Sequence, residues 1–292
     1  MSLARHACRP ACRPAHAAAA APRRGGMDPD AAAYVAAVRA AGATVSPAQA
    51  KAIDTFVKGE KAGGRWTLHR RLWFPVWADA EANAIDMVSL ASGEWLFPTA
   101  IEHQTGFVRN LDSNGMFDTK ADPSALGLTT GSATLWHLCT LCDARDTATR
   151  YVLSAGVSGQ LDKNFSLMSL AGSVYFQCGS ATAGAGQLGG ALARASQVGI
   201  IMGTRRSEGL YLYHRNGTAG TFSELAKDDD TTVYGSMPAV KMRGLATVFS
   251  GSNYAGTVGA WGIGLGMTQP QAEAFTSALE TLWETVTGLT MP

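Results

Sequence analysis

Acidic side chains are the first candidates for chemistry, because retaining glycosidases need two carboxyl groups about 5 Å apart. Glu280 and Glu284 form a close pair, but their spacing puts them one turn apart on a predicted exposed helix face, where solvation is the ordinary interpretation. Glu208 and Glu224 flank a predicted hairpin and stand alone. These carboxylates therefore predict no glycosidase centre.

Cysteine and aspartate clusters could bind a metal ion. Cys139 and Cys142 form a CxxC pair, but a strand over 134–142 would place them on opposite faces, which makes joint ligation difficult. We expect buried, inert thiols, with a metal or redox pair as the alternative. The three consecutive aspartates at 228–230 could help to bind calcium, but such a run on a loop indicates a solvated turn.

Histidines and glycines complete the search for a reactive site. His103, His137 and His214 fall in the part of the chain rich in predicted strands, and no serine or cysteine near them has a nucleophile-elbow context. The stretch GQLGGALARA at 186–195 lacks the strand, turn, helix order and the lysine of a phosphate loop. We therefore assign no catalytic, cofactor-binding or metal-ligating residue, expect no cofactor, and identify no ligand-binding residue.

Three tryptophans lie beside three arginines early in the chain. Aromatic rings stack on sugars and bases, so these residues could form a carbohydrate platform or a nucleic-acid patch. The alternative that we favour is a core or subunit interface, because a short helical unit has few other large side chains. The residues are Arg65, Trp66, Arg70, Arg71, Trp73 and Trp77.

The stretch GLYLYHRNGTAGTF at 209–222 predicts a hairpin. Its leucines share one strand face with His214 and are expected to face the core. Its tyrosines share the other face, which is left for solvent, a glycan or a protein. Asn216 and Gly217 offer the positive φ of a tight turn, so Gly217→Val should cost about 1 kcal/mol or more.

Composition limits the possible partners. The 292 residues carry a net charge of +1, which disfavours recruitment of nucleic acid or an anionic membrane surface, and no stretch approaches the roughly 20 apolar residues of a membrane span. Only 16% of residues are charged, which suits an all-β protein that lives among other protein surfaces. Five cysteines, an odd number, argue against a complete intrachain disulfide framework.

The first 26 residues differ from the rest, since they contain a single leucine and no aromatic residue. We expect this tract to be disordered, or to lie upstream of a true start at Met27. A zinc quartet of two cysteines and two histidines is the alternative, but the repeated ACRP unit explains their spacing more simply.

Helical signals occupy residues 27–92. Asp28 and Ser46 are expected to cap the first two helices, each followed by proline, and glycines end both. A third helix, broken before Pro75, and a fourth over 79–90 should complete the module.

Past residue 95 apolar residues recur with a period of two, in short segments that are separated by turn residues. Many such strands predict a jelly-roll β-sandwich. A capping box at Thr268 opens a closing helix that ends before Gly288 and docks on the sheet or on the helical module. The expected strands are 134–142, 150–157, 164–170, 172–178, 197–205, 208–215, 218–222, 231–235, 244–250 and 257–265.

This order resembles a family of bacteriophage and prophage minor virion proteins, in which a short helical segment precedes a concanavalin A-like, laminin-G-like jelly roll. The motifs that carry the resemblance are DPDAAAYVAAVRAAGATVSPAQAKAIDTFVKGEKAGGRW at 28–66, LWFPVWADAEANAIDMVSL at 72–90, TGFVRNLDSNGMFDTKADPS at 105–124, the hairpin at 209–222 and VGAWGIGLGMTQPQAEAFTSALETLWETVTGL at 258–289. The resemblance covers nearly everything after residue 27.

The resemblance implies a mainly β fold, with a helical module over 27–92 as particle anchor and a jelly roll with its closing helix over 93–292. It implies a non-enzymatic structural or accessory protein of a phage or phage-like particle, such as a minor tail, spike or head-decoration component. Such a protein would be oligomeric in the virion, assemble in the bacterial cytoplasm, contact other virion proteins and touch host surface glycans through the sandwich. The alternative is a polysaccharide-degrading hydrolase or lyase, although the Glu-x-Asp-x-x-Glu run common in jelly-roll glycosidases is absent from the sequence.

Overall fold

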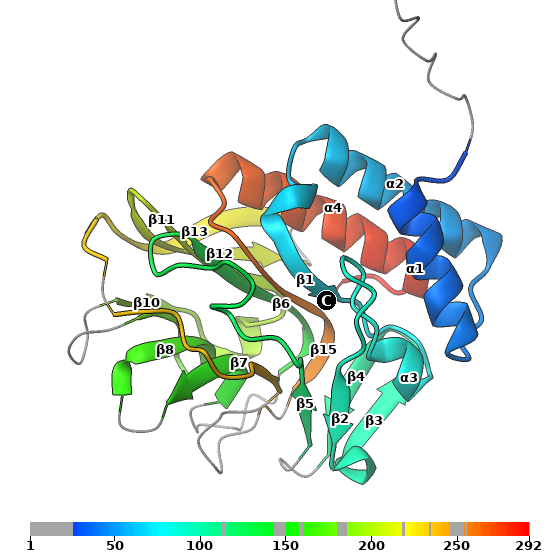
Figure 1. Ribbon diagram of the computed structural model, residues 1–292, viewed down its shortest axis with the longest axis horizontal. Coiled ribbons are helices and arrows are strands. Elements are labelled where there is room, and N and C mark those ends of the chain that lie inside the picture. Colours follow the sequence, from blue (N-terminus) through cyan, green and yellow to red (C-terminus); the bar gives the residue numbers. More distant parts are fainter. Residues whose placement is uncertain are drawn as a thin grey trace, which may run out of the picture.

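The fold is a two-sheet β-sandwich with a layer of helices on one side, in a computed structural model (Figure 1). The structure describes residues 26–291 except 112–114, 143–149, 158–159, 180–185, 218–219, 234, 246–253 and 255. The N-terminal tract up to residue 25, with its cysteines and histidines, lies outside these residues. Among the described residues, no helix is both long and apolar enough to cross a membrane.

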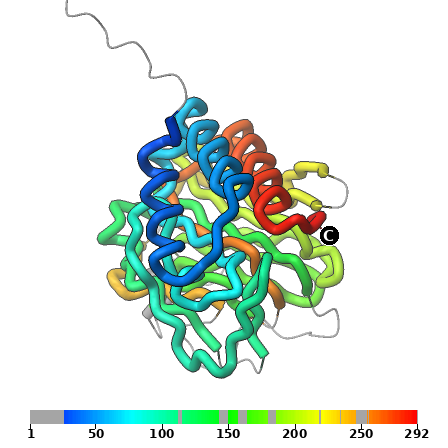
Figure 2. The backbone as a smooth tube through the Cα atoms, turned by 90° about the vertical axis from the view of Figure 1, so that its right-hand side faces the viewer, coloured from blue at the N-terminus to red at the C-terminus, as the bar shows by residue number. Residues whose placement is uncertain are grey.

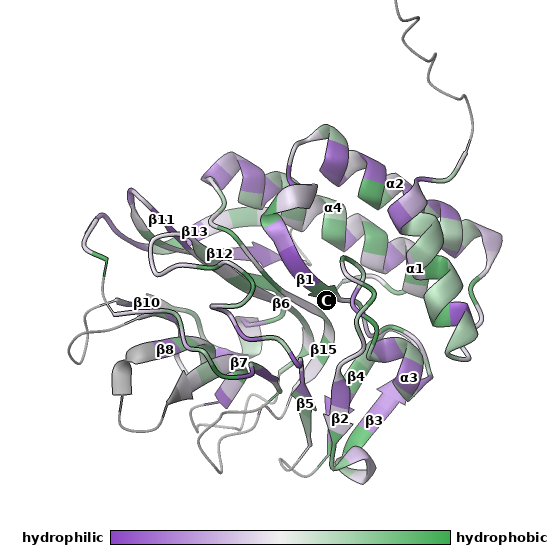
Figure 3. Cartoon of the chain, in the orientation of Figure 1, coloured by the Kyte–Doolittle hydropathy of each residue, from purple (hydrophilic) through white to green (hydrophobic). Residues whose placement is uncertain are grey.

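Three long helices form the outer layer: α1 (Pro29–Ala40), α2 (Pro47–Ala62) and α4 (Gln269–Thr287). They lie side by side with α2 between the other two (Figure 2). The capping predictions are confirmed, since Asp28 caps α1 and complete capping boxes open α2 and α4. Both α2 and α4 carry hydrophilic and hydrophobic segments along their lengths, as helices with one buried face require (Figure 3).

The first sheet lies under this helical layer and is antiparallel throughout, in the order β13-β12-β11-β6-β15-β4-β3, with β1 also paired to β15. Its strands are β1 (His69–Trp73), β3 (Ile101–Gln104), β4 (Phe107–Asn110), β6 (Ala133–Leu141), β11 (Gly199–Arg206), β12 (Gly209–Asn216), β13 (Thr221–Asp228) and β15 (Thr257–Gly264).

The second sheet forms the other layer of the sandwich, in the order β10-β9-β8-β7-β14-β5-β2. Its strands are β2 (Glu94–Leu96), β5 (Met116–Asp118), β7 (Arg150–Val157), β8 (Gln160–Ser169), β9 (Ser173–Cys178), β10 (Gln187–Ala191) and β14 (Arg243–Gly244). A short helix α3 (Ala80–Asn83) and 3-10 turns at Trp66–Leu68, Pro98–Ala100 and Arg194–Ser196 complete the elements. The expected mainly β sandwich with N-terminal helices and a closing helix is confirmed.

Two hydrophobic clusters hold the layers together. One lies between the helices and the first sheet, where Trp136 of β6 and Phe275 of α4 pack with ring centroids 5.0 Å apart. The other lies between the two sheets and contains Phe117, Phe165 and Phe176. The first sheet is therefore apolar on both faces, which explains the nearly continuous apolar run of β15.

Of the two helices predicted between residue 66 and residue 90, the first is wrong, and the second, expected over 79–90, is only the short helix α3. His69–Trp73 forms β1, which pairs with β15 and follows the 3-10 turn at Trp66–Leu68. The helix α3 has four residues and is capped by Asp79. The physical reason is that the backbone groups of β1 find partners on a distant strand, which local helical signals do not reveal. The boundary at residue 92 stays a prediction, although β1 before it lies within the sandwich.

Other strand predictions need smaller corrections. The glycine-rich stretch at 186–195 contains β10, whose glycines lie against neighbouring side chains. The strand expected at 218–222 begins at Thr221 and runs to Asp228, and the described residues of 231–235 form no strand. Most of the segment 244–250 lies outside the described residues. Strands β2, β3, β4 and β5 are additional.

The hairpin of β12 and β13 agrees with the sequence on one face only. Leu210 and Leu212 enter the core between the sheets, as expected. The tyrosine face is not open to solvent or a ligand, because Tyr211 and Tyr213 are buried in the cluster under the helices. On the same face, Arg215 pairs with Glu280 of α4. Two-sided burial explains why alternation in this strand separates two kinds of core rather than core from surface.

The turn of this hairpin also differs from the prediction. The positive φ belongs to Gly220, at 59°, and neither Asn216 nor Gly217 has one. A Cβ atom at Gly217 would lie 2.3 Å from the Cγ of Met291, a buried residue near the C-terminus. Gly217 therefore makes room for the C-terminal segment.

We expect Gly217→Val to lower the free energy of unfolding by about 1 to 3 kcal/mol through this overlap. Urea unfolding followed by circular dichroism measures the change. In a Met291→Ala background the same substitution should cost less, because the overlapping atoms are gone. Equal costs in both backgrounds would contradict the contact.

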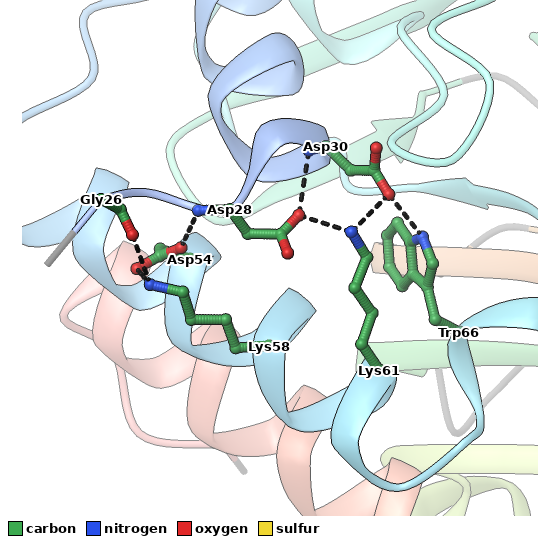
Figure 4. A network of polar contacts seen from close by, with 7 residues as sticks. All are labelled: Gly26, Asp28, Asp30, Asp54, Lys58, Lys61 and Trp66. Carbon is green, nitrogen blue, oxygen red and sulfur yellow. Dashed lines mark hydrogen bonds and ion pairs between the residues drawn. The ribbon is translucent and has the colours of Figure 1, made fainter. Parts of the chain in front are cut away.

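Lysine and aspartate side chains fasten the start of α1 to α2 (Figure 4). Lys61 Nζ lies 2.6 Å from Asp28 Oδ1 and 2.8 Å from Asp30 Oδ2, and Trp66 Nε1 donates to Asp30 at 2.9 Å. The backbone N–H of Asp28 donates to Asp54 at 2.6 Å. These contacts hold the first described turn of the chain on the helical layer.

Candidate functional site

A line of polar residues crosses the second sheet from edge to edge, and we call it the polar row. Each member is the direct register partner of the next, on all seven strands. In order from β10 to β2, the members are Gln187, Gln177, Ser166, Ser154, Arg243, Asp118 and Glu94.

The polar row lies on the face of the second sheet that points away from the first. Neighbouring residues along the same strands, such as Phe165 and Phe176, fill the core between the sheets, and side chains alternate along a strand. The helices α1, α2 and α4 all belong to the hydrophobic cluster on the other sheet (Figure 1). The row is buried at its centre, where Ser166 is 3% exposed, and Glu94 at one end is exposed.

Aromatic and apolar residues form the next line on this face. Tyr151, Met168, Tyr175 and Gly189 are successive register partners on β7, β8, β9 and β10. A Cβ atom at Gly189 would lie 2.4 Å from the ring of Tyr175, so the glycine lets that ring lie against β10. Both tyrosines are half-buried. An aromatic line beside a hydrogen-bonding line is the composition that ligand sites for amphipathic molecules require.

Asn164 adds a buried side-chain amide to this face. It lies two residues before Ser166 on β8 and is 8% exposed. Its Oδ1 atom has no hydrogen-bond partner among the described residues. A buried acceptor without a partner costs about 1 to 3 kcal/mol, so a hydroxyl or amide donor from a bound molecule would be favourable there.

The charged half of the polar row contains two ion pairs. Arg243 Nη1 lies 2.8 Å from Asp118 Oδ2, and Lys120 Nζ lies 2.9 Å from Glu94 Oε2. Asp118 and Glu94 are themselves register partners on β5 and β2. This carboxylate pair has no signature in the sequence, because its members are 24 positions apart and only strand pairing brings them together.

The carboxylates singled out from the sequence lie elsewhere. Glu280 is not on an exposed face, because it is buried against Arg215 of β12. Glu284 accepts a hydrogen bond from the backbone N–H of Met291 at 2.9 Å. Glu208 lies 3.7 Å from Arg206, while Glu224 is exposed on β13. The structure brings none of these into a pair.

Cys139 and Cys142 are together, contrary to the sequence expectation of opposite faces. Their sulfur atoms lie 2.8 Å apart. The reason is a bulge: Cys139 and Leu141 of β6 face consecutive residues Val258 and Thr257 of β15. One extra residue on β6 shifts the alternation, so residues three apart reach the same side.

The three histidines do not form a site. His103 contacts Asn83 Nδ2 at 3.0 Å, and His214 contacts the carbonyl of Val198 at 2.8 Å. Burial lowers the pKa of all three, and that of His137 falls to about 3 through burial and the nearby His214. They are therefore neutral side chains at neutral pH.

The three tryptophans next to the arginines lie in different parts of the molecule and form no common surface. Trp73 lies between the sheets and Trp77 under the helices, which confirms the core interpretation for both. Trp66 is half-buried and bonded to Asp30. Asp229 pairs with Lys227 at 3.1 Å, and no metal-binding group of three or more histidine, cysteine or acidic residues occurs among the described residues.

A groove of about 610 Å³ runs along the outer surface between α2 and α4. Small side chains line both walls, Ala48, Ala52 and Thr55 on one helix and Ala274 and Ala278 on the other. The helical layer thus offers an apolar concave surface on the side of the molecule opposite to the polar row.

No family model and no curated protein matches the sequence. Solved structures are similar in fold. A Trypanosoma rangeli sialidase mutant displaying trans-sialidase activity matches with a TM-score of 0.50 at 10% identity, over 79% of this chain and 39% of that one. The CBM40 of the Ruminococcus gnavus IT-sialidase, bound to α2,3-sialyllactose, has a TM-score of 0.40 at 16% identity, over 55% of this chain and 90% of that one. The botulinum neurotoxin serotype D binding domain has a TM-score of 0.48 at 7% identity, over 73% of this chain and 51% of that one. At these identities the likeness extends to the fold alone.

Proposed function

We propose that this chain is a non-enzymatic component of a phage or phage-like particle that contacts glycans through the polar row. The observation that carries the glycan part is the unbroken line of polar register partners across all seven strands of the second sheet. The particle part is supported by the order of sequence motifs after residue 27.

The chemistry of the polar row suits a sugar. A sugar ring offers many hydroxyl groups, each a donor and an acceptor, and the row supplies amide, hydroxyl, guanidinium and carboxylate partners. The half-buried rings of Tyr151 and Tyr175 on the adjoining line could stack on its apolar face. The half-buried or exposed members of the row, Gln187, Arg243 and Glu94, give contact points to an extended chain of sugars.

The opposite side of the molecule suits attachment. The helical layer and its groove point away from the polar row, so attachment there would leave the row facing outward. Localisation to a virion and contact with other virion proteins are further parts of the proposal.

Glycan binding can be tested with the double variant Gln177→Ala/Gln187→Ala on a glycan array that includes sialyllactose, the sugar bound by one sandwich of similar fold. We expect the intact chain to bind and the variant to bind about 30-fold more weakly, because two hydrogen bonds of about 1 kcal/mol each are lost. Gln104→Ala, on β3 of the other sheet, is the matched control and should bind as the intact chain does.

Enzymatic degradation of polysaccharide is the second candidate, because Asp118 and Glu94 are register partners. Turnover of purified host capsule or lipopolysaccharide that disappears in Asp118→Asn or Glu94→Gln would overturn the non-enzymatic assignment. Each carboxylate already holds its own cation, which favours an ion-pair role. Absence of both binding and turnover would refute the glycan part of the proposal.

The particle assignment has its own test. Particles purified from an induced host should contain this chain at a fixed ratio to the other structural proteins, measured by quantitative mass spectrometry. Its absence from purified particles would refute the attachment, whatever the glycan array shows.

A further inference from the structure

Two thiols and a phenol meet where β6 ends. The sulfur atoms of Cys139 and Cys142 are 2.8 Å apart, and the hydroxyl of Tyr254 lies 2.8 Å from the first and 3.1 Å from the second. The Cys142 sulfur also lies 3.5 Å from the carbonyl oxygen of Gln197. Both cysteines are buried, but Leu141 between them is exposed, so the pair lies just beneath the surface.

We propose that Cys139 and Cys142 form a reversible disulfide. The bulge in β6 places both sulfurs on one side, and their separation exceeds a covalent S–S bond of about 2.05 Å by less than about 1 Å. Closing the bond therefore needs only a small movement. The disulfide would link Cys139, at the bulge, to Cys142, the first residue after β6.

The oxidant is a low-molecular-weight disulfide such as oxidised glutathione. The Cys142 thiolate attacks one sulfur of it, which forms a mixed disulfide and releases one small thiol. The Cys139 thiolate, its proton lost to solvent, then attacks the Cys142 sulfur and releases the second small thiol. The protein dithiol is oxidised to a disulfide, and the small disulfide is reduced to two thiols.

The groups around the pair favour Cys142 as the thiol that attacks the small disulfide first. Its hydrogen bond with Cys139 lowers the pKa of its thiol against the effect of burial, and Tyr254 and Arg194 act in the same direction. Burial and the neighbouring Cys142 raise the pKa of Cys139. Cys142 is also the more exposed of the two. A thiolate is the attacking form, so the reaction should begin there.

Cys178 provides a contrast within the same chain. Burial raises the pKa of its thiol to about 12, and the hydrogen-bond contact of its sulfur is the carbonyl of Thr130 at 4.0 Å. It should stay a thiol under conditions that oxidise the pair, and it serves as the internal control.

Peptide mapping tests the proposal on the full chain. Cleavage after Lys120 and Arg145 puts both cysteines of the pair in one peptide, while Cys178 lies in another. After treatment with oxidised glutathione, denaturation and iodoacetamide, we expect the first peptide to lack two hydrogen atoms and both labels. Prior reduction with dithiothreitol should restore both labels, and Cys178 should be labelled in either case.

Single substitutions separate the pair from general thiol oxidation. Cys142→Ser and Cys139→Ser should each abolish the internal disulfide, whereas Cys178→Ser should leave it unchanged. Two labels on the peptide after oxidation, a stable glutathione adduct on each cysteine, or a cross-link to Cys8 or Cys12 would each overturn the proposal.

Discussion

Trp283→Ala should lower the free energy of unfolding by about 3 to 5 kcal/mol, the range for removing a buried tryptophan. Trp283 is the anchor of α4 and is 1% exposed. Its Nε1 donates to the carbonyl of Gly106 at 2.8 Å, and a Cβ atom at Gly259 of β15 would lie 2.5 Å from the same nitrogen. The ring therefore joins the closing helix to β15 and to the turn before β4.

The loss should appear as a melting temperature lower by about 10 °C, since 1 kcal/mol shifts a domain of this size by roughly 2 to 4 °C. Glu273→Ala is the matched control, because Glu273 is exposed on the same helix and its loss should change stability by less than about 0.5 kcal/mol. Trp283→Phe should recover most of the packing and lose the hydrogen bond. Equal melting of Trp283→Ala and Glu273→Ala would mean that α4 does not depend on this anchor.

The three long helices were predictable from the sequence. Asp28, Ser46 and Thr268 cap them through atoms within three residues in sequence, so local signals suffice. Strand β1 was missed because its five residues include two arginines and its stability comes from pairing with β15, almost 200 positions away. Strand pairing of this kind has no local signature.

The candidate site could not be predicted from the sequence, because it also depends on the pairing of distant strands. Ser166 and Gln177 alternate with the core residues Phe165 and Phe176. This alternation predicts which side chains share one face of a strand, but not which residues of the next strand lie beside them. The polar row exists only in the register of seven strands. The cysteine pair depends on a bulge whose position is set by β15. Conversely, the tyrosine face of β12 looked open because α4, which covers it, is more than 50 residues away.

Glu60 is the buried charge that links α2 to β1, and it is fully excluded from solvent. Arg65 Nη2 lies 2.7 Å from its Oε1, and His69 Nε2 lies 3.2 Å from its Oε2. Burial would raise the pKa of Glu60, but the hydrogen bonds from His69 and Arg65 outweigh burial and lower the pKa below its usual 4.5. The carboxylate is therefore held charged in the folded chain.

Glu60→Leu should cost about 3 to 5 kcal/mol, because it leaves Arg65 and His69 without their partner in a dry site. Urea unfolding at pH 7 measures the loss. In the double variant Glu60→Leu/Arg65→Met part of the stability should return, since the unpaired cation is removed as well. A double variant less stable than Glu60→Leu would contradict this account.

The same site should respond to acid. Because the folded pKa of Glu60 is depressed, its contribution is complete above about pH 4.5 and is lost as the pH falls towards the lower folded value. We therefore expect the difference in unfolding free energy between the intact chain and Glu60→Gln to shrink as the pH falls below about 4.5. Lys51→Ala, at an exposed position on the same helix, should show no such convergence. A difference between the intact chain and Glu60→Gln that stays constant down to pH 3 would mean that Glu60 does not carry the charge.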